Sequence, residues 1–376
     1  MDSSDYQKLA QQFMGNAVQV AAGENIWIEY KGPEAGLLAA ACAIEVSKAG
    51  ANPYLIDSGS AALNGWLPNA TDAELTAKGA QYLATMKQMQ GYIRIDDDAD
   101  QSQMIDAAVQ LARYRKFVMS DATDHRVNHT RWLVTSAPTP AFAKACGMDV
   151  PAFEKFYKDV CLLDYGRMTA AAQPLEDLMR NAKDVHILGR DTDLRFSVAG
   201  INAVSCTGLR NIPDGECYTS PVRDSINGTI LFGKSNYMGE SFQSIRLTFN
   251  AGCVVKAEVE TAERTAALNK ILDTDAGGRY TGEFAIAFNP YVRDPVGDIL
   301  FDEKIDGSLH IALGDAYKTA DNGNVSDVHW DMVHIQRPEY GGGTIEFDGQ
   351  IIRKDGRFVL PSLLPLNPEN LKTLKP

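Results

Sequence analysis

Hydrophobic and polar residues along the first half of the chain follow a pattern typical of strands that alternate with helices. The predicted strands are the short apolar runs 24–30, 52–57, 91–95 and 132–135, with a further candidate at 116–119. The predicted helices are 35–49, which has an apolar face, then 71–89, 101–115 and the stretches that follow Pro151 and Pro174. Such alternation indicates βαβ units and therefore an α/β domain with a mainly parallel, Rossmann-like sheet.

From about residue 185 helical patterns become rare, and short alternating segments separated by Gly, Asn and Asp take over. The predicted strands here are 186–188, 193–198, 229–232, 243–249 and 253–259, with one clear helix at 261–272. This pattern favours an α+β domain with a mostly antiparallel sheet. We therefore expect an N-terminal domain at 1–184 and a C-terminal domain at 185–376.

Composition narrows the classes of protein that need to be considered. The 376 residues are 45% hydrophobic and 23% charged, as in ordinary globular proteins. A net charge of −13 argues against nucleic acid or an anionic membrane as a partner. The six cysteines are scattered, with no Cys-x-x-Cys pair, so we expect a reduced, cytoplasmic protein.

Several charged or glycine-containing stretches of the first half carry no chemistry on their own. No Gly-x-Gly-x-x-Gly motif follows the first predicted strand, so a dinucleotide site is not indicated. The acidic run 96–98 and the segment 121–129 are interpreted as solvated loops at strand ends.

The densest group of reactive side chains lies between His310 and Asp331. His329 and Asp331 are two residues apart, so on a strand both would point to one face and could bind one ion. His310 ends an alternating run that also predicts a strand, and the phenol of Tyr317 follows it. Taken alone, a His-x-Asp pair is more typical of core histidines than of metal ligands.

Three further carboxylate motifs lie in the C-terminal half. Glu216 follows a Pro-Asp-Gly turn, where a glutamate at the start of a strand is more often exposed than held in a site. Glu283 lies in an otherwise apolar run, and a buried carboxylate needs a partner, for which a cation suffices. The segment 302–304, Asp-Glu-Lys, has the pattern of an ordinary charged turn.

These motifs together supply three carboxylates and two imidazoles, from Glu216, Glu283, His310, His329 and Asp331. This mixture suits Zn²⁺, Mn²⁺, Co²⁺ or Fe²⁺, and it is sufficient for a two-metal site in which one carboxylate bridges. Spacing along the sequence does not by itself bring the five side chains together.

Several sequence blocks resemble the M29 family of metalloaminopeptidases, of the aminopeptidase T and aminopeptidase S type. The blocks are NIPDGECYTSP, YTGEF, HIALGDAY, HWDMV and GGGTIEFDGQIIRKDGRF, in the family's order and across the whole chain. The resemblance implies an α/β N-terminal domain, a C-terminal catalytic domain and a homodimer. The positions that it implies for a pair of divalent ions, Zn, Co or Mn, are Glu216, Glu283, His310, Tyr317, His329 and Asp331.

The reaction implied by the resemblance is hydrolysis of the N-terminal residue of a small peptide. Two ions would polarise the scissile carbonyl and lower the pKa of a shared water, while Glu216 or Glu283 carries its proton. Tyr317 would either bind a metal or donate to the oxyanion, and the sequence leaves both roles open.

The chain departs from the best-known members of that family in two ways. It is shorter, and the segment between His310 and His329 is contracted, so substrate preference does not carry over. Those members also carry an acidic residue shortly before the position of His310, for which Glu303 and Asp306 are the candidates here.

Two other functions stay open. The same superfamily includes iron-dependent dioxygenases that cleave dihydroxypyridine rings with a two-His-one-carboxylate triad, of which His329 and Asp331 would be two members. Those relatives have His at the position of Glu283 and lack the position of Glu216, so the two glutamates favour hydrolysis. The third interpretation is a repurposed amide hydrolase or a protein that binds a small amino compound.

Overall fold

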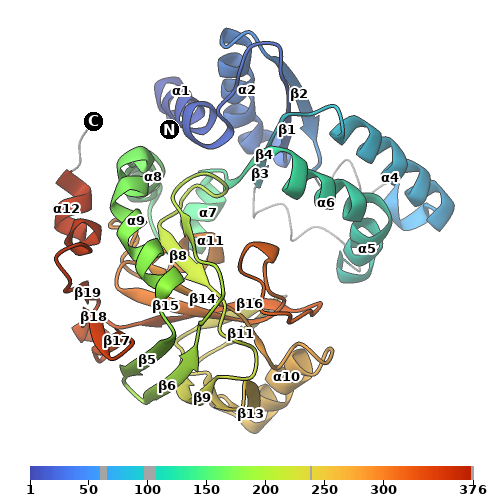
Figure 1. The fold of residues 1–376 in the computed structure, drawn as a ribbon. Helices are drawn as coiled ribbons and strands as arrows, with labels where there is room; N and C mark the ends of the chain where they lie inside the picture. The colour runs from blue at the N-terminus through green and yellow to red at the C-terminus, as the bar shows by residue number, and fades with distance from the viewer. Residues whose placement is uncertain (60–65, 97–106, 238, 374–376) are drawn as a thin grey trace. The chain divides into compact units, whose positions relative to one another are not determined.

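The computed structural model describes residues 1–59, 66–96, 107–237 and 239–373 (Figure 1). The chain forms two compact units, which are Met1–Leu163 with Gly208–Pro213 and Asp164–Thr207 with Asp214–Pro376. The expected boundary near residue 184 therefore falls inside the second unit, because the helix before it packs against C-terminal strands. No helix in these described ranges combines the length and the apolarity needed to cross a membrane.

The first unit contains a four-stranded sheet in which all neighbouring strands run parallel. Its strands, in spatial order, are β2 (Asn52–Asp57), β1 (Asn25–Tyr30), β3 (Gly91–Asp96) and β4 (Arg131–Ser136). The parallel α/β arrangement expected from the alternating pattern is confirmed.

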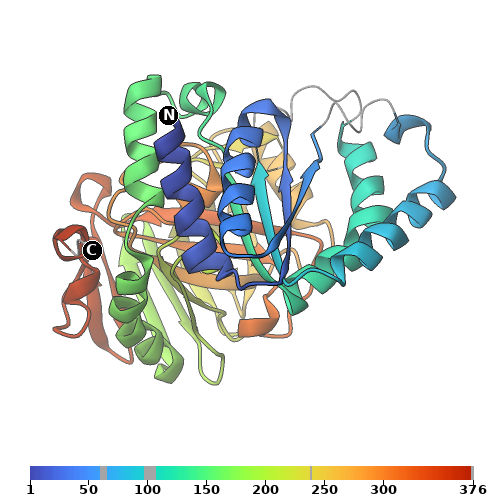
Figure 2. The same ribbon diagram turned by 90° about the horizontal axis from the view of Figure 1, so that it is seen from above.

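Helices cover both faces of this sheet (Figure 2). The helices and helical turns of the first unit are α1 (Ser3–Gln12), η1 (Phe13–Val18), α2 (Gly32–Lys48), η2 (Leu67–Asn69), α4 (Asp72–Met86), α5 (Ala107–Tyr114), η4 (Arg115–Met119), α6 (Ser120–His129), α7 (Pro140–Ala145) and α8 (Val150–Cys161). The predicted start of α4 is confirmed, because the Thr71 side chain accepts from the Glu74 N–H while the Glu74 carboxylate accepts from the Thr71 N–H.

The strand predicted at 116–119 is wrong, because these residues lie in the π-helical turn η4 that joins α5 to α6. Val118 is buried there against Leu67 and Leu75. A short apolar run of this length does not distinguish a strand from a buried helical turn.

The loop expected at 121–129 is also wrong, because the segment forms most of α6. Ala122 is buried and its polar neighbours are exposed or half-buried, so the residues are solvated as expected while their backbone is helical. Of the helix expected at 101–115, residues 101–106 lie outside the described ranges.

The helix α9 (Tyr165–Asn181) opens the second unit and extends to both sides of Pro174, where it was expected to begin. Its buried side chains recur at helical spacing and include Tyr165, Met168, Ala171, Ala172, Leu175 and Met179. This buried apolar face outweighs the one backbone hydrogen bond that an internal proline removes.

Two antiparallel sheets make up most of the second unit, as the sequence pattern predicts. The eight-stranded sheet has the order β13 (Cys253–Glu258), β12 (Arg246–Asn250), β9 (Asn227–Leu231), β6 (Thr192–Ser197), β5 (Asp184–Gly189), β17 (Gly343–Phe347), β18 (Gln350–Lys354) and β19 (Arg357–Phe358). The five-stranded sheet has the order β16 (His329–Ile335), β15 (Ser308–Gly314), β14 (Thr281–Ala287), β8 (Glu216–Thr219) and β7 (Val204–Cys206).

Shorter elements complete this unit. They are the hairpin of β10 (Ser235–Tyr237) and β11 (Glu240–Phe242), the helices α10 (Ala262–Leu272), α11 (Ile299–Asp302) and α12 (Pro368–Thr373), and the turns η5 (Lys318–Ala320), η6 (Pro338–Tyr340) and η7 (Leu364–Leu366).

One face of the five-stranded sheet belongs to the hydrophobic core of the unit. Phe284 of β14 meets Phe196 of the eight-stranded sheet at 5.1 Å between ring centroids. Ile286, Ile311 and Met332 point to the same face and are fully buried. The opposite face of the same strands is therefore left for polar side chains.

Candidate metal centre

Glu216, Glu283 and His310 lie on one face of the five-stranded sheet, on three neighbouring strands. β14 carries Glu283, Ala285 and Ala287 at alternate positions, so these side chains share a face. Glu216 of β8 pairs with Ala287, and His310 of β15 pairs with Ala285. Because directly paired residues point to the same side of a sheet, the three predicted ligands come together.

The strand β16 adds His329 and Asp331 to this face. Asp331 pairs with Ala312 of β15, which in turn pairs with Glu283, and His329 pairs with Gly314. Alanine and glycine at the paired positions are short, so they leave the space above the sheet to the longer polar side chains.

Two glycines make this close arrangement possible. A Cβ on Gly282 would lie 2.0 Å from the carbonyl oxygen of Asp315, and one on Gly314 would lie 2.0 Å from the carbonyl oxygen of Val328. Gly314 also has a φ of +101°, which L side chains rarely adopt. Both positions therefore require glycine within the strands that carry Glu283 and His310.

Glu283 occupies the middle of the polar cluster and faces both histidines. Its Oε1 lies 3.1 Å from His310 Nε2, and its Oε2 lies 3.8 Å from His329 Nε2. His329 Nε2 is also 3.6 Å from Asp331 Oδ1, while His310 Nδ1 is 3.7 Å from Glu216 Oε2. The cluster thus contains two groups, Glu216–Glu283–His310 and Glu283–His329–Asp331, that share one carboxylate.

The orientation of the His329 ring is fixed by the backbone. Its Nδ1 lies 3.0 Å from the carbonyl oxygen of Asp315, to which it can only donate. The lone pair of the neutral ring is then on Nε2, which faces Glu283 and Asp331. A second partner of this kind is what orients most metal-binding histidines.

The residues present fit a divalent metal ion. Glu216 Oε2 and His310 Nδ1 are buried, face each other, and have no hydrogen-bond partner in the described part of the chain. Separations of 3.1–3.8 Å between facing ligand atoms bracket the value of about 3.4 Å expected for two ligands of a tetrahedral ion bound at about 2.1 Å. Carboxylate and imidazole together suit Zn²⁺, Mn²⁺, Co²⁺ and Fe²⁺.

The prediction of an ordinary charged turn at 302–304 is wrong. Lys304 is fully buried, and its Nζ lies 2.5 Å from Glu216 Oε1, 2.8 Å from Glu303 Oε1 and 3.6 Å from Asp214 Oδ1. An ammonium group enters the interior only where carboxylates compensate its charge, and here three of them do.

Glu303 and Asp306, the two candidates for an additional acidic residue, lie in different environments. Glu303 has a carboxylate oxygen within 4.8 Å of ligand atoms of His310 and Asp331, so it reaches the cluster. Asp306 instead accepts a hydrogen bond of 2.6 Å from Arg293. Glu303 is therefore the candidate that the geometry favours.

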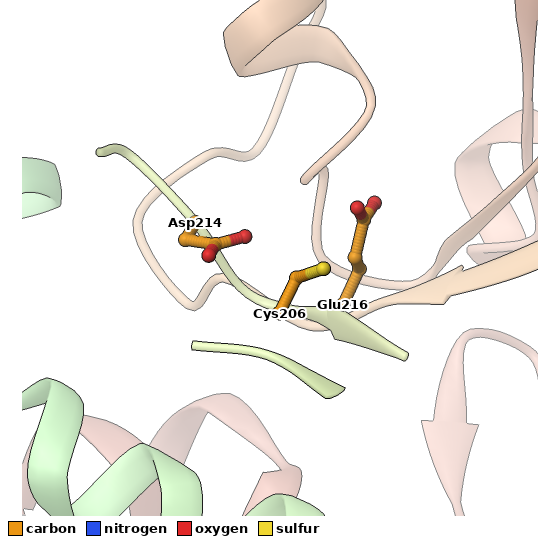
Figure 3. A group of neighbouring side chains, drawn as sticks. All are labelled: Cys206, Asp214 and Glu216. Carbon is orange, nitrogen blue, oxygen red and sulfur yellow. The ribbon is translucent and has the colours of Figure 1, made fainter. Parts of the chain in front are cut away.

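A further group of metal-type side chains lies at the edge of the sheet, where Figure 3 shows Cys206, Asp214 and Glu216 beside one another. Their ligand atoms lie within 4.8 Å of one another. However, Lys304 is already paired with both carboxylates. Burial and the neighbouring carboxylates also raise the pKa of the Cys206 thiol, so this sulfur stays protonated and is a poor ligand.

The carboxylates and imidazoles of the cluster shift one another's pKa values. Burial lowers the pKa of His310, but Glu216, Glu283 and Asp331 outweigh it and raise this pKa to about 10. Burial raises the pKa of Glu303 to about 7 despite Lys304, and it also raises the pKa of Glu216. A bound cation would replace these protons.

Tyr317 lies beside the cluster, in the segment after β15. Its ring centroid is 4.9 Å from that of His329 and 5.9 Å from that of Tyr218. The residue is 50% exposed, so it is the member of the predicted set that is most open to solvent. Such a position suits contact with a substrate.

Sequence reasoning missed Lys304 and Asp214 as members of the cluster. Asp214 belongs to the Pro-Asp-Gly turn and was interpreted as a turn residue, although it is 1% exposed. Only Asp302-Glu303-Lys304 offered a signal, since a lysine between acidic and apolar residues can pair inward as well as outward. Its partners lie far away in the sequence, which no local pattern reveals.

The chain is similar to known proteins in sequence and in fold. The family described as thermophilic metalloprotease, M29, matches residues 2–358. Aminopeptidase 2 of Geobacillus stearothermophilus is 30% identical over 292 residues, which cover 67% of this chain and 67% of that protein. Aminopeptidase T of Thermus thermophilus is 33% identical over 148 residues, which cover 36% of this chain and 35% of that protein.

Two solved structures have a similar fold. Wild-type AmpT from Thermus thermophilus superposes with a TM-score of 0.77 and 20% identity, covering 95% of this chain and 99% of that chain. The 2,5-dihydroxypyridine dioxygenase of Pseudomonas putida superposes with a TM-score of 0.65 and 14% identity, covering 97% of this chain and 99% of that chain.

Proposed function

We propose that this chain, which belongs to the M29 family of metalloproteases, is an aminopeptidase that removes the N-terminal residue of small peptides through two divalent metal ions. The observation that carries the proposal is the convergence of three carboxylates and two imidazoles on one face of one sheet. Relatives named as aminopeptidases support this reaction class.

Glu283 is the proposed bridge between the two ions, because its two oxygens face different imidazoles. Glu216 and His310 would complete one side, and His329 and Asp331 the other. We propose Zn²⁺, Co²⁺ or Mn²⁺ as the ions, since this mixture of oxygen and nitrogen ligands suits all three.

When bound, such ions polarise a scissile carbonyl and lower the pKa of a shared water. Glu216 or Glu283 is proposed to accept the proton of that water and to return it to the leaving amine. The Tyr317 hydroxyl is proposed to donate to the substrate's carbonyl oxygen, and the contacts of its ring with His329 and Tyr218 hold it near the cluster.

The test is metal analysis of protein purified without chelators, followed by assays on amino-acid p-nitroanilides and dipeptides. We expect two divalent ions per chain and release of the first residue from dipeptides with a free α-amine. Dipeptides with an acetylated α-amine serve as the matched control and should not be cleaved. Protein that contains no metal and cleaves none of these substrates would refute the proposal.

The dioxygenase alternative has one observation in its favour. His310 Nε2 and His329 Nε2 lie 3.8 and 3.6 Å from Asp331 Oδ1, which resembles a two-His-one-carboxylate triad. Oxygen consumption with Fe²⁺ and 2,5-dihydroxypyridine, without peptide cleavage, would support it over hydrolysis.

We also propose that the enzyme acts in the cytoplasm as a homodimer. Light scattering of the purified chain measures the number of subunits, and a monomer that is fully active would contradict the homodimer.

A further inference from the structure

Lys304 is a cation that belongs to the interior of the metal centre. It is fully buried, and its ammonium group is within 3.6 Å of carboxylate oxygens from Glu216, Glu303 and Asp214. A buried ammonium with three carboxylate neighbours occupies the kind of environment that a metal ion would otherwise fill.

The lysine divides the two oxygens of Glu216 between different partners. Oε1 accepts a hydrogen bond of 2.5 Å from Lys304 Nζ. Oε2 is buried, has no hydrogen-bond partner within the described ranges, and lies 3.7 Å from His310 Nδ1. Glu216 therefore turns a single oxygen toward the histidine that is its neighbour in the metal centre.

Asn289, which is fully buried, hydrogen-bonds to the backbone of both Lys304 and Asp214. The Asn289 N–H donates to the Lys304 carbonyl at 3.1 Å, and its side-chain amide donates to the Asp214 carbonyl at 2.6 Å. The same asparagine thus ties together the two segments that supply the ammonium and one of its carboxylates. The lysine is held in place rather than resting there by chance.

We propose that Lys304 is a built-in cation of the metal centre. It is a positioning residue that occupies one oxygen of Glu216 and thereby lowers the affinity for the divalent ion on the Glu216 side. Among the described side chains, none that faces the ion between His329 and Asp331 competes with it in this way. This ion is therefore bound more tightly than the ion on the Glu216 side. This inference rests on the two-ion site put forward under Proposed function.

The physical reason is competition between positive charges for one carboxylate. A metal ion bound at Glu216 Oε2 shares that carboxylate with the ammonium and is repelled by it. Without the ammonium, Glu216 could offer both oxygens, and the buried carboxylates of Asp214 and Glu303 would lose their counter-charge. Loss of the repulsion, the second free oxygen of Glu216 and the uncompensated carboxylates would each strengthen binding of the divalent ion.

The test compares Lys304→Met with the parent protein and with Arg337→Met. The control removes another buried cation of the same unit, since Arg337 donates to the Asp306 carbonyl and to Glu339, outside the cluster. Stepwise dissociation constants for Zn²⁺ are measured by competition with a chromophoric chelator, and the visible spectrum of the Co²⁺-loaded protein reports its coordination.

We expect the weaker Zn²⁺ site of Lys304→Met to tighten at least tenfold and the Co²⁺ spectrum to change. The metal-free variant should melt at a lower temperature than the parent, and Zn²⁺ should close this gap. Arg337→Met should lower the melting temperature but keep both dissociation constants within threefold. If Lys304 only stabilised the fold, Lys304→Met would behave like Arg337→Met, with a lower melting temperature and unchanged dissociation constants.

If Lys304→Met does not fold without metal, Lys304→Gln is used instead, because it keeps a hydrogen-bond donor and removes the charge. The rate at which a chelator extracts the ions is then measured in place of the titration. A weaker site that is unchanged or loosened in these variants overturns the proposal. Binding data alone decide this point, so absence of peptidase activity would refute the proposed function and leave the inference about Lys304 to be judged separately. A parent protein that binds fewer than two ions overturns both.

Discussion

Replacing Glu283 by glutamine removes the one carboxylate that the two halves of the metal centre share. The amide keeps the size of the side chain and an oxygen that can still bind a metal, so the change is mainly one of charge. The lost charge lies 3.1 Å from His310 Nε2 and 3.8 Å from His329 Nε2, the two places from which an ion would also be held.

The magnitude follows from these short distances. At an effective dielectric constant of about 20, two unit charges about 4 Å apart interact by about 4 kcal/mol, and a divalent ion doubles the interaction. Because the amide oxygen retains part of the attraction, we assign half of this value, about 4 kcal/mol, to the loss. At about 1.4 kcal/mol for each factor of ten, the dissociation constant rises about a thousandfold.

The measurement is the metal content of Glu283→Gln after dialysis, together with a Zn²⁺ titration and the rate of dipeptide hydrolysis. We expect at most one ion per chain and a fall in kcat/KM of at least about a thousandfold, because the proposed bridge would place both ions on one water. Excess Zn²⁺ should restore little of the rate.

The matched control is Glu258→Gln in β13 of the eight-stranded sheet, which removes a carboxylate paired with Lys256 at 2.9 Å. It should retain both ions and the parental rate. Two ions bound by Glu283→Gln with dissociation constants within threefold of the parent would refute the reasoning, whatever the rate.

Four further outcomes are expected. Removing metal with a chelator should lower the melting temperature by about 5–10 °C, since an ion at a hundredfold excess over its dissociation constant stabilises by about 2.7 kcal/mol; an unchanged transition after verified metal loss would contradict this. Gly282→Ala should destabilise by about 3 kcal/mol, because its Cβ would lie 2.0 Å from the Asp315 carbonyl oxygen, whereas Gly233→Ala, with open space around its Cβ, should be near neutral in chemical denaturation. Tyr317→Phe should lower kcat by about ten- to a thousandfold with metal content unchanged, and a parental kcat would remove the hydroxyl from the mechanism. Burial lowers the pKa of His334 in the folded protein, so its contribution to stability is present above the unfolded pKa of about 6.5 and is lost as pH falls below it; the melting temperature of His334→Gln should depend less on pH between about 7 and 5, and an equal dependence would exclude this histidine.

The clustering of the candidate ligands could be predicted in part, because strand geometry is local. The spacing of His329 and Asp331 determines that they share a face once the segment is a strand, and a glutamate inside the apolar run of β14 indicates a buried carboxylate. The alternation of strand and helix in the first half likewise predicts the parallel sheet.

What could not be predicted depends on partners that are distant in the sequence. Lys304 has the local pattern of a surface residue, and only Glu216 and Asp214 on other segments explain its burial. Val118 has the apolar neighbours of a strand, yet its burial against Leu67 and Leu75 is compatible with a helical turn. In each case the deciding interaction is tertiary.

The segment that connects β15 to β16 begins and ends at residues that are paired with each other in the sheet. Gly314, the last residue of β15, pairs directly with His329, the first residue of β16. Insertions or deletions in the intervening segment can therefore be absorbed without changing how His310 and Asp331 face each other. A change in the length of this connection would therefore alter what lies beside the cluster, Tyr317 included, and would leave the strands that carry His310, His329 and Asp331 in register.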